Sequence, residues 1–409
     1  MSSAVASSCC GGIDVHSQLM VCAVRYESPS GERFELAEFQ ALPAEYPRLV
    51  EWFVAHGCQR LALESTGVYW RTLYWALRDG GIAVTVANPR DVRIVGGRKT
   101  DRSDAQRLAT LLAMSVLKAS FVPSREQERV RDVTRLRAAL VRTHTQTKLR
   151  LLKLLVQFGV RLDTVLSDAL GVSGVKLLKA LIAGERDVER LLALVHASIR
   201  HREDQVARLR IVLAAGWPST TTSANRLVQL LLERLEFEET QLDQLEHELT
   251  QLGVALPEFG HAVTQLDSIP GIGPTSAALI LGEIGWDMTR FSCDKHLASW
   301  AGVCPGNRIT GGKSKSGKPA KGNSILRQAL VECAWPAIRA LKGQTEFGRK
   351  YHAMVARGMP KPKAALAVAH QLLRVIYAML KSGQAYDPRY AINQRDARHT
   401  AYLAQLETV

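Results

Sequence analysis

Four acidic residues occupy places where their side chains could bind metal. Asp101 and Asp104 lie three residues apart in KTDRSDAQRL (99–108), on one edge of an expected helix. Asp14 ends an apolar strand-like run in GGIDVHS, and Glu64 ends another in RLALESTG. Packing gives little reason for an acid at the exposed end of an apolar strand. We therefore predict that the four carboxylates converge on two Mg²⁺ or Mn²⁺ ions, which would activate one oxygen and stabilise another in phosphodiester cleavage.

A simpler interpretation applies to residues 99–108 taken alone. Acidic residues favour the first turn of a helix, so Asp101 and Asp104 could belong to a capped, solvent-exposed helix start. The two acids at strand ends shift the balance toward the metal site. Nearby Lys99 and Arg102 would then face phosphate.

The elements that would position these acids are strands and helices in alternation. Between Gly11 and about residue 90, strand-like runs are separated by helix-like segments that end at glycine. The strand-like runs are IDV, LMVCAVRY, RFELAEF, RLALE and IAVTVA, and the helix-like ones are PAEYPRLVEWFVAHG and YWRTLYWALRDGG. Hairpin-like strands followed by strand–helix alternation predict a mixed sheet with helices packed on it.

From about Ser124 onward the pattern predicts an almost wholly helical chain. The segment 124–155 is rich in cations and carries only three acids, which favours a phosphate-facing surface over an ordinary solvent-exposed helix face. Its basic residues are Arg125, Arg129, Arg131, Arg135, Arg137, Arg142, Lys148, Arg150 and Lys153.

Residues 228–252 contain a seam of apolar residues spaced three and four apart, interrupted by Glu238. This spacing predicts a coiled coil or a bundle. The seam could pack against the helices near 124–155 of the same chain or against a second copy. It consists of Val228, Leu231, Leu235, Leu242, Leu245, Leu249 and Leu252.

A further unit is expected to begin near Leu266. LDSIPGIGPTSAALILGEI predicts two helices joined by a tight turn. In that turn Gly271 and Gly273 would let backbone amides approach a phosphate, as in helix–hairpin–helix DNA contacts. A plain turn between two helices is the alternative.

Composition agrees with a soluble protein that binds nucleic acid. The 409 residues exceed one ordinary core, and a formal net charge of +14 would attract a polyanion. Seven cysteines without a CxxC pair fit the reduced thiols of a cytoplasmic protein. The start MSSAVASSCCGG lacks the features of a signal peptide, and the polar residues in AALAVAHQLLRVIYAML favour a packed helix over a membrane span.

Several motifs, in order along nearly the whole chain, resemble those of the insertion-sequence-one-ten transposases, a family that includes the Piv-type DNA invertases. GGIDVHS, ALESTG and KTDRSDAQRLA resemble the DEDD motifs of that family. LDSIPGIGPTSA, FSCDKHLASWAGVCPGN and KSGKPAKGNSILRQAL resemble its carboxy-terminal transposase domain. The segment 160–222 carries the least motif information.

The resemblance implies an RNase H-like (RuvC-like) amino-terminal domain, with Asp14, Glu64, Asp101 and Asp104 as its acidic tetrad. It implies a helical carboxy-terminal domain in which a serine nucleophile joins DNA covalently. It also implies dimers and tetramers with composite sites, and a structured non-coding bridge RNA that pairs with donor and target DNA.

One departure from the family falls in the loop NRITGGKSKSGK. Thr310 stands where the family usually has a serine, and its extra methyl group crowds an in-line attack. Ser314 and Ser316 are nearby, although Ser316 matches a different family position. A working threonine and an impaired or repurposed site are both open. The lysines of this loop, which could simply grip phosphate, are Lys313, Lys315, Lys318 and Lys321.

Other side chains are lesser candidates. His16 could orient substrate but is typical of a polar strand end. Trp300 is expected to pack in a core. His261, Cys293 and His296 have no spacing that suits a metal site.

We therefore predict an α/β plus α fold. Its parts are an RNase H-like domain (8–123), a helical coiled-coil region (124–260), a mainly helical transposase domain with a helix–hairpin–helix-like turn (261–385) and a tail (386–409). The predicted function is a metal-dependent, RNA-guided DNA transposase or recombinase of a mobile element. The alternatives are a resolvase-like nuclease that forms no covalent intermediate and a catalytically weakened nucleic-acid-binding relative.

Overall fold

The structure, a computed structural model, describes residues 9–28, 31–64, 67–88, 101–215, 217, 222–304, 308–310, 313–316 and 322–388. The side chains of residues 28, 101, 222, 308–310 and 313–316 lie outside this description. The chain divides into two compact units, Met1–Pro123 and Ser124–Val409.

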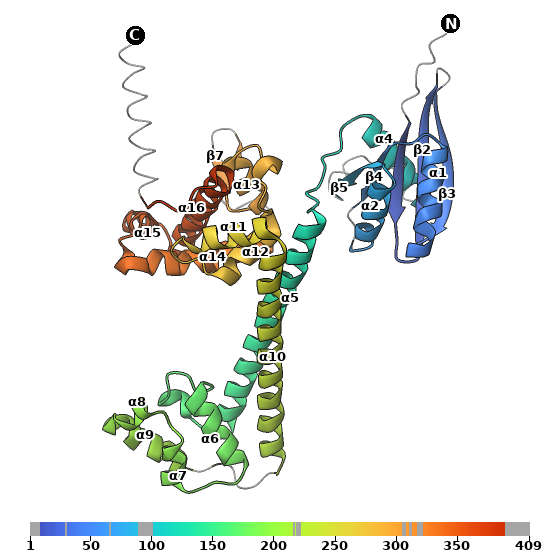
Figure 1. The fold of residues 1–409 in the computed structure, drawn as a ribbon. Coiled ribbons are helices and arrows are strands. Elements are labelled where there is room, and N and C mark those ends of the chain that lie inside the picture. Colours follow the sequence, from blue (N-terminus) through green and yellow to red (C-terminus); the bar gives the residue numbers. More distant parts are fainter. Residues whose placement is uncertain are drawn as a thin grey trace, which may run out of the picture. The chain divides into compact units, whose positions relative to one another are not determined.

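The amino-terminal unit is built on a mixed five-stranded sheet with the order β3-β2-β1-β4-β5 (Figure 1). β2 runs antiparallel to β1 and β3, whereas β4 and β5 run parallel to β1. These strand directions and this order agree with the RNase H-like domain that the resemblance implies, and each strand and helix predicted in this region is confirmed. The elements are β1 (Cys10–Val15), β2 (Leu19–Ser28), β3 (Gly31–Gln40), α1 (Tyr46–Ala55), β4 (Arg60–Glu64), α2 (Trp70–Asp79), β5 (Ala83–Ala87) and α4 (Asp101–Ala113).

Alternation along the strands gives the sheet two different faces. Large apolar side chains such as Ile13 and Leu63 pack with those of α1 and α2. Small residues occupy the other face, and Gly12 is the closest point of approach for α4. A Cβ atom at Gly12 would overlap the backbone of Ala105 and Ala109, so only glycine lets α4 rest directly on β1.

The carboxy-terminal unit contains a long helical hairpin of α5 (Arg125–Gln157) and α10 (Thr222–Ala255) (Figure 1). At 1.5 Å per residue, each helix is about 50 Å long. The short helices α6 (Val172–Ile182), α7 (Val188–Ala193), α8 (Ala197–Arg200) and α9 (Glu203–Ala214) pack where α5 ends and α10 begins.

The other end of the hairpin carries a helical bundle (Figure 1). Its helices are α11 (Pro257–Asp267), α12 (Pro274–Ile284), α13 (Asp294–Ala301), α14 (Ser324–Arg339), α15 (Glu346–Ala356) and α16 (Lys361–Ser382). Between α13 and α14 lies a small antiparallel sheet of β6 (Arg308–Thr310) and β7 (Lys313–Ser316).

The apolar seam of α10 packs against α5 of the same chain, which is the intramolecular alternative. Val228 and Leu252 are buried near its two ends. Glu238, the interruption, is a buried carboxylate that accepts hydrogen bonds from Thr147 Oγ1 of α5 at 3.2 Å and from Arg234 Nε at 2.8 Å. The ends of the seam are therefore buried within one protomer, whereas Leu242 and Leu245 in its middle are half-buried.

The apolar late segment forms α16, as predicted. α16 is the one helix in the described part of the chain whose length and composition would allow a membrane crossing. Val368, Leu372 and Ile376 are nevertheless fully buried against the rest of the bundle, so we interpret α16 as a core helix. All seven cysteines are free, in agreement with the prediction of reduced thiols.

Candidate active site

Asp14 and Glu64 stand next to each other at the ends of β1 and β4. The parallel register pairs Ile13 with Leu63, so the following residues on the two strands are Asp14 and Glu64. Neighbouring strands lie about 4.8 Å apart, and residues in register share a face of the sheet. Asp14 comes two residues after Gly12, so this is the face that α4 covers.

Helix α4 brings the second pair of acids to this face. Its Ala105 rests on Gly12, and Asp104 directly precedes Ala105. Asp104 is half-buried, with Oδ1 at 3.9 Å from Nη1 of Arg107. Asp101 begins the helix one turn before Ala105, but its side chain lies outside the described residues.

The four acids thus belong to elements that share one face, but the metal site itself stays a prediction. Among the side chains that the structure describes, which leave out Asp101, no group of three His, Cys, Asp or Glu residues is arranged to hold a metal ion. The donors that are described are carboxylate oxygens, which Mg²⁺ and Mn²⁺ prefer.

His16 contacts the first acid of the set. Its Nε2 atom lies 3.0 Å from Oδ2 of Asp14, a buried residue. The two residues are two apart, so they share one side of the chain as it leaves β1. The sequence predicts a polar strand end here, and the two-residue spacing was the only signal for this contact.

The two cations next to the α4 acids do not form a described phosphate site. Arg102 donates from Nη2 to Glu38 Oε1 of β3 at 2.8 Å, so its described partner is a carboxylate. The arginine remains exposed, and its contact with phosphate stays a prediction. Lys99 lies outside the described residues.

At least three of the nine basic residues of this segment pair with carboxylates, so the charge pattern alone overstates how many of them are available to phosphate. Arg131 and Arg135 bind the buried Glu283, and Arg137 binds Glu246. These partners lie more than 100 residues away along the chain, which is why the local charge pattern did not reveal them.

A narrower basic surface remains on α5. Arg142, Arg150 and Lys153 are exposed and spaced eight and three residues apart, which places them on one helix face. We call these three residues the α5 basic stripe. Its charge and exposure suit a nucleic-acid backbone.

The two glycines of the PGIGP turn have different environments. Gly271 has φ = +93°, and a Cβ atom there would overlap the backbone of Cys333 and Ala337 on α14. Packing between helices therefore explains Gly271 without any phosphate. Gly273 has open space around its Cα and immediately precedes α12, so it is the glycine that leaves room for a ligand.

The loop with the expected nucleophile is described by its backbone at two short strands. Thr310 ends β6 and pairs with Lys313 of β7. The side chains of Thr310, Lys313, Ser314, Lys315 and Ser316 lie outside the described residues, as do Lys318 and Lys321 entirely. The ring of Trp300, just before this loop, packs on Phe291 at a centroid distance of 5.6 Å, and the residue is half-buried instead of lying in the core.

Two family models match the chain. Residues 11–160 match a DEDD-type model described as "Transposase", and residues 263–352 match one described as "Transposase IS116/IS110/IS902 family". Together these matches cover more than half of the chain, in the order that the motifs predict. The chain belongs to the IS110 family of transposases.

Several transposases are similar to this IS110-family chain. A "Probable family 20 transposase" of Pseudomonas aeruginosa is 25% identical over 77% of this chain and 82% of its own length. A "Transposase for insertion sequence element IS1111A" of Coxiella burnetii is 22% identical over 75% of this chain and 73% of its own. The "Pilin gene-inverting protein" of Moraxella bovis is 32% identical, but the match covers 36% of this chain and less than half (46%) of that relative.

A solved structure of Thermus thermophilus RuvC is 15% identical and covers 27% of this IS110-family chain and 99% of its own, with a TM-score of 0.22. The fold assignment rests on the strand order and directions of the five-stranded sheet. Membership of a DEDD transposase family implies the use of a divalent metal ion, and the oxygen donors of Asp14, Glu64 and Asp104 fit such an ion.

Proposed function

We propose that this protein is the DNA transposase or recombinase of a mobile element and that it cuts and rejoins DNA strands. The observation that carries the proposal is the register of Ile13 with Leu63 on adjacent parallel strands, since Asp14 and Glu64 directly follow these two residues on the face covered by α4. Family membership supplies the substrate class, DNA.

In this proposal the acidic tetrad of Asp14, Glu64, Asp101 and Asp104 holds Mg²⁺ or Mn²⁺. When bound, the metal would lower the cost of negative charge on the oxygens of the reacting phosphodiester. His16 holds the Asp14 carboxylate in one orientation. A hydroxyl in the 307–318 loop, with Thr310 as the first candidate, attacks phosphorus and forms a phosphoester bond between the protein and one DNA end. The P–O bond to the other DNA end breaks, and that end leaves as a sugar hydroxyl, so the proton given up by the attacking hydroxyl is balanced. Lysines of the loop balance the phosphate charge.

Guidance by a structured bridge RNA, and assembly as dimers or tetramers, complete the proposal. The excess of positive charge over the whole chain and the exposed α5 basic stripe support a polyanionic partner beyond the reacting strand. Sequencing the RNA that copurifies with the protein tests this part. One discrete structured RNA supports guidance, whereas random fragments would contradict it.

The tetrad assignment is tested with Glu64→Gln, which removes the charge and nearly keeps the shape. Strand cleavage in Mg²⁺ should fall by about 100-fold or more, while DNA and RNA binding survive. Glu51→Gln makes the same change on the exposed face of α1 and should leave cleavage at the wild-type rate. Undiminished cleavage by Glu64→Gln would remove Glu64 from the site.

A second candidate is a catalytically weakened relative that binds nucleic acid without cutting it. The threonine at the nucleophile position favours this candidate. Strand cleavage by the wild-type protein with its RNA decides against it. Cleavage without any covalent protein–DNA adduct would instead favour a resolvase-like nuclease.

A further inference from the structure

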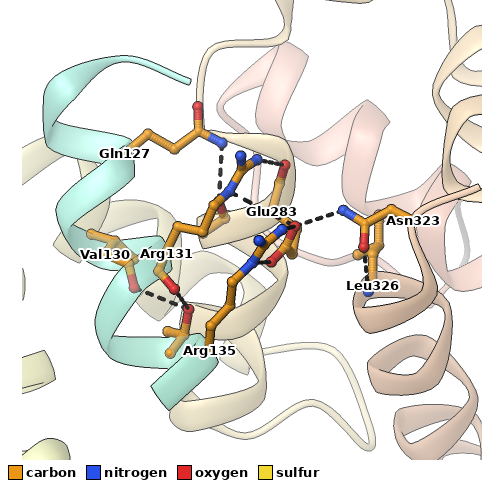
Figure 2. A network of polar contacts seen from close by, with 9 residues as sticks. Gln127, Val130, Arg131, Arg135, Glu283, Asn323 and Leu326 are labelled. Atoms are coloured by element: carbon orange, nitrogen blue, oxygen red, sulfur yellow. Dashed lines mark hydrogen bonds and ion pairs between the residues drawn. The ribbon is translucent and has the colours of Figure 1, made fainter. Parts of the chain in front are cut away.

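Glu283, near the end of α12, is a carboxylate with 0% exposure that side chains from two other segments hold in place (Figure 2). Arg135 of α5 binds both of its oxygens, with Nε to Oε1 at 2.7 Å and Nη2 to Oε2 at 2.9 Å. Asn323 Nδ2 donates to Oε2 at 2.6 Å, and Arg131 Nε lies 3.8 Å from the same oxygen. A buried charge is tolerated only when it is paired as fully as this one.

The first turns of α5 also bind the backbone at the end of α12 (Figure 2). Arg131 donates to the carbonyl oxygens of Gly282 at 2.9 Å and Glu283 at 2.8 Å, and Gln127 Nε2 donates to that of Gly282 at 3.1 Å. One face of α5 contacts this end of α12, because successive members of the set Gln127, Arg131 and Arg135 are one helical turn apart. A cation at the carboxyl end of a helix stabilises the helix, because this end carries the negative end of the helix dipole.

The side chain of Asn323 makes two hydrogen bonds, on the side of Glu283 away from α5. Its Oδ1 accepts from the backbone N–H of Leu326 at 3.1 Å and so caps α14. Its amide nitrogen donates to Glu283, as described above. The orientation of the cap is therefore tied to the orientation of the buried carboxylate.

Asn323 also lies at the base of the loop that follows α13. Its backbone N–H donates to the carbonyl oxygen of Trp300 at 3.3 Å. Gly322 approaches Gly302 so closely that a Cβ atom at Gly322 would overlap the Gly302 backbone. The two ends of the segment 303–321, which carries Thr310, thus meet directly beside Asn323.

We propose that Glu283 is a positioning residue for this loop. Through Asn323 and Arg135 it holds the base of the 303–321 segment in one orientation against α5, and so sets where Thr310 and the loop lysines meet DNA. The inference rests on the proposed function, because the loop must contact DNA. A purely structural ion pair would need Arg135 alone, whereas here one carboxylate oxygen also holds the cap of the helix that follows the loop.

The test uses Asn323→Asp, since aspartate caps a helix as well as asparagine does. The substitution keeps the cap of α14 and places a carboxylate against Glu283. A displacement of about 1 Å at a reacting group can lower a rate as much as 100-fold, so we expect covalent adduct formation to slow by about tenfold or more. DNA and RNA binding should stay within about twofold of wild type, because the basic stripe of α5 is untouched.

The double variant Asn323→Asp/Glu283→Gln exchanges donor and acceptor. The amide introduced at position 283 can donate to the carboxylate introduced at position 323, which remakes this hydrogen bond. The amide nitrogen replaces an oxygen that also accepts from Arg135 Nη2, so that second bond is lost. Adduct formation should recover in part relative to Asn323→Asp alone, because the hydrogen bond between positions 283 and 323 is remade while the one from Arg135 Nη2 is lost. Asn323→Ser keeps a cap but loses the reach to Glu283, and it should remain slow.

Hydrogen–deuterium exchange of segments 300–304 and 322–327 gives a readout that needs no activity. Exchange there should be faster in Asn323→Asp and return toward wild type in the double variant. If wild-type protein forms no adduct with matched RNA and DNA, the proposed function fails and the exchange data alone decide the positioning inference. Unchanged exchange in Asn323→Asp would overturn the inference. So would equal losses of binding, melting temperature and adduct without recovery in the double variant.

Discussion

The Nε2 atom of His16 lies 3.0 Å from Oδ2 of Asp14, which follows Ile13, the last residue of β1 in register with β4. Asp14 is buried, so few other arrangements of its carboxylate are accessible. Removing a group that orients a metal-binding side chain typically lowers metal affinity or activity by about 10- to 100-fold.

The first prediction concerns this contact. His16→Ala should lower strand cleavage by about tenfold and raise the Mg²⁺ concentration needed for half-maximal cleavage, because Asp14 loses its orienting partner. The measurement is cleavage rate against Mg²⁺ concentration. His56→Ala, which removes a histidine paired with Glu35 in the same unit, is the control and should keep the wild-type Mg²⁺ dependence. Equal Mg²⁺ curves for both variants would make His16 a simple strand-end residue.

The second prediction concerns the nucleophile. Thr310→Ser removes the methyl group that crowds the hydroxyl and should keep or raise the yield of covalent protein–DNA adduct. Thr310→Val keeps the shape without the oxygen and should abolish it. The measurement is adduct trapping on denaturing gels with a matched RNA and DNA. An adduct that survives in Thr310→Val points instead to Ser314 or Ser316.

The third prediction concerns the α5 basic stripe. Replacing Arg142, Arg150 and Lys153 with alanine should weaken binding to nucleic acid of any sequence. Each lost phosphate contact should reduce the slope of log K against log salt by about 0.9 on duplex DNA. The measurement is a titration at several salt concentrations. Arg208→Ala, an exposed cation on α9, is the control, and an unchanged slope in the triple variant would place the nucleic acid elsewhere.

The fourth prediction follows from the pKa of Glu283. Burial would raise this pKa, but the hydrogen bond from Arg135, the charge of Arg131 and the hydrogen bond from Asn323 together hold it below its usual value. The carboxylate then stabilises the folded state fully above about pH 4.3, the ordinary glutamate pKa, and that contribution is lost as pH falls further through the lowered folded pKa. The free energy of unfolding of Glu283→Gln should therefore depend less on pH in this range. That of Glu332→Gln, a change at an exposed residue, should follow wild type.

The fifth prediction separates the two glycines of the PGIGP turn. Gly271→Ala adds a Cβ at φ = +93° against the α14 backbone, so it should lower the free energy of unfolding by about 2 kcal/mol or more. Gly273→Ala meets open space and should unfold like wild type. If Gly273 lies near a phosphate, Gly273→Ala will still weaken DNA binding. Normal binding by this variant would leave the turn a plain connection between helices.

Much of the fold follows from local pattern. Short apolar, strand-like runs predict the five strands, and the acids Asp14 and Glu64 stand out because packing cannot explain them at strand ends. The seam of α10 was equally visible, including the interruption at Glu238. Pattern could not choose its partner, because the same stripe packs equally well on α5 or on a second copy.

The errors concern contacts between residues far apart in the chain. Arg131 and Arg135 look like phosphate ligands until the fold brings Glu283 to them. Gly271 is also required by close packing on α14, which the local pattern does not show, and its contact with phosphate stays a prediction. A run of cations shows where charge lies, but the carboxylate that neutralises it is selected by tertiary structure.

The two ends of the 303–321 segment lie close together, so the segment can be replaced as one unit. Its ends are fastened to each other by Gly322 against Gly302, and to the core by Asn323. The free energy of closing a loop changes only slowly with its length, so longer or shorter versions could be grafted between the same anchor points without refolding the bundle. Evolution, and protein engineering, can therefore vary the nucleophile and its lysines as a block while the helices beneath stay the same.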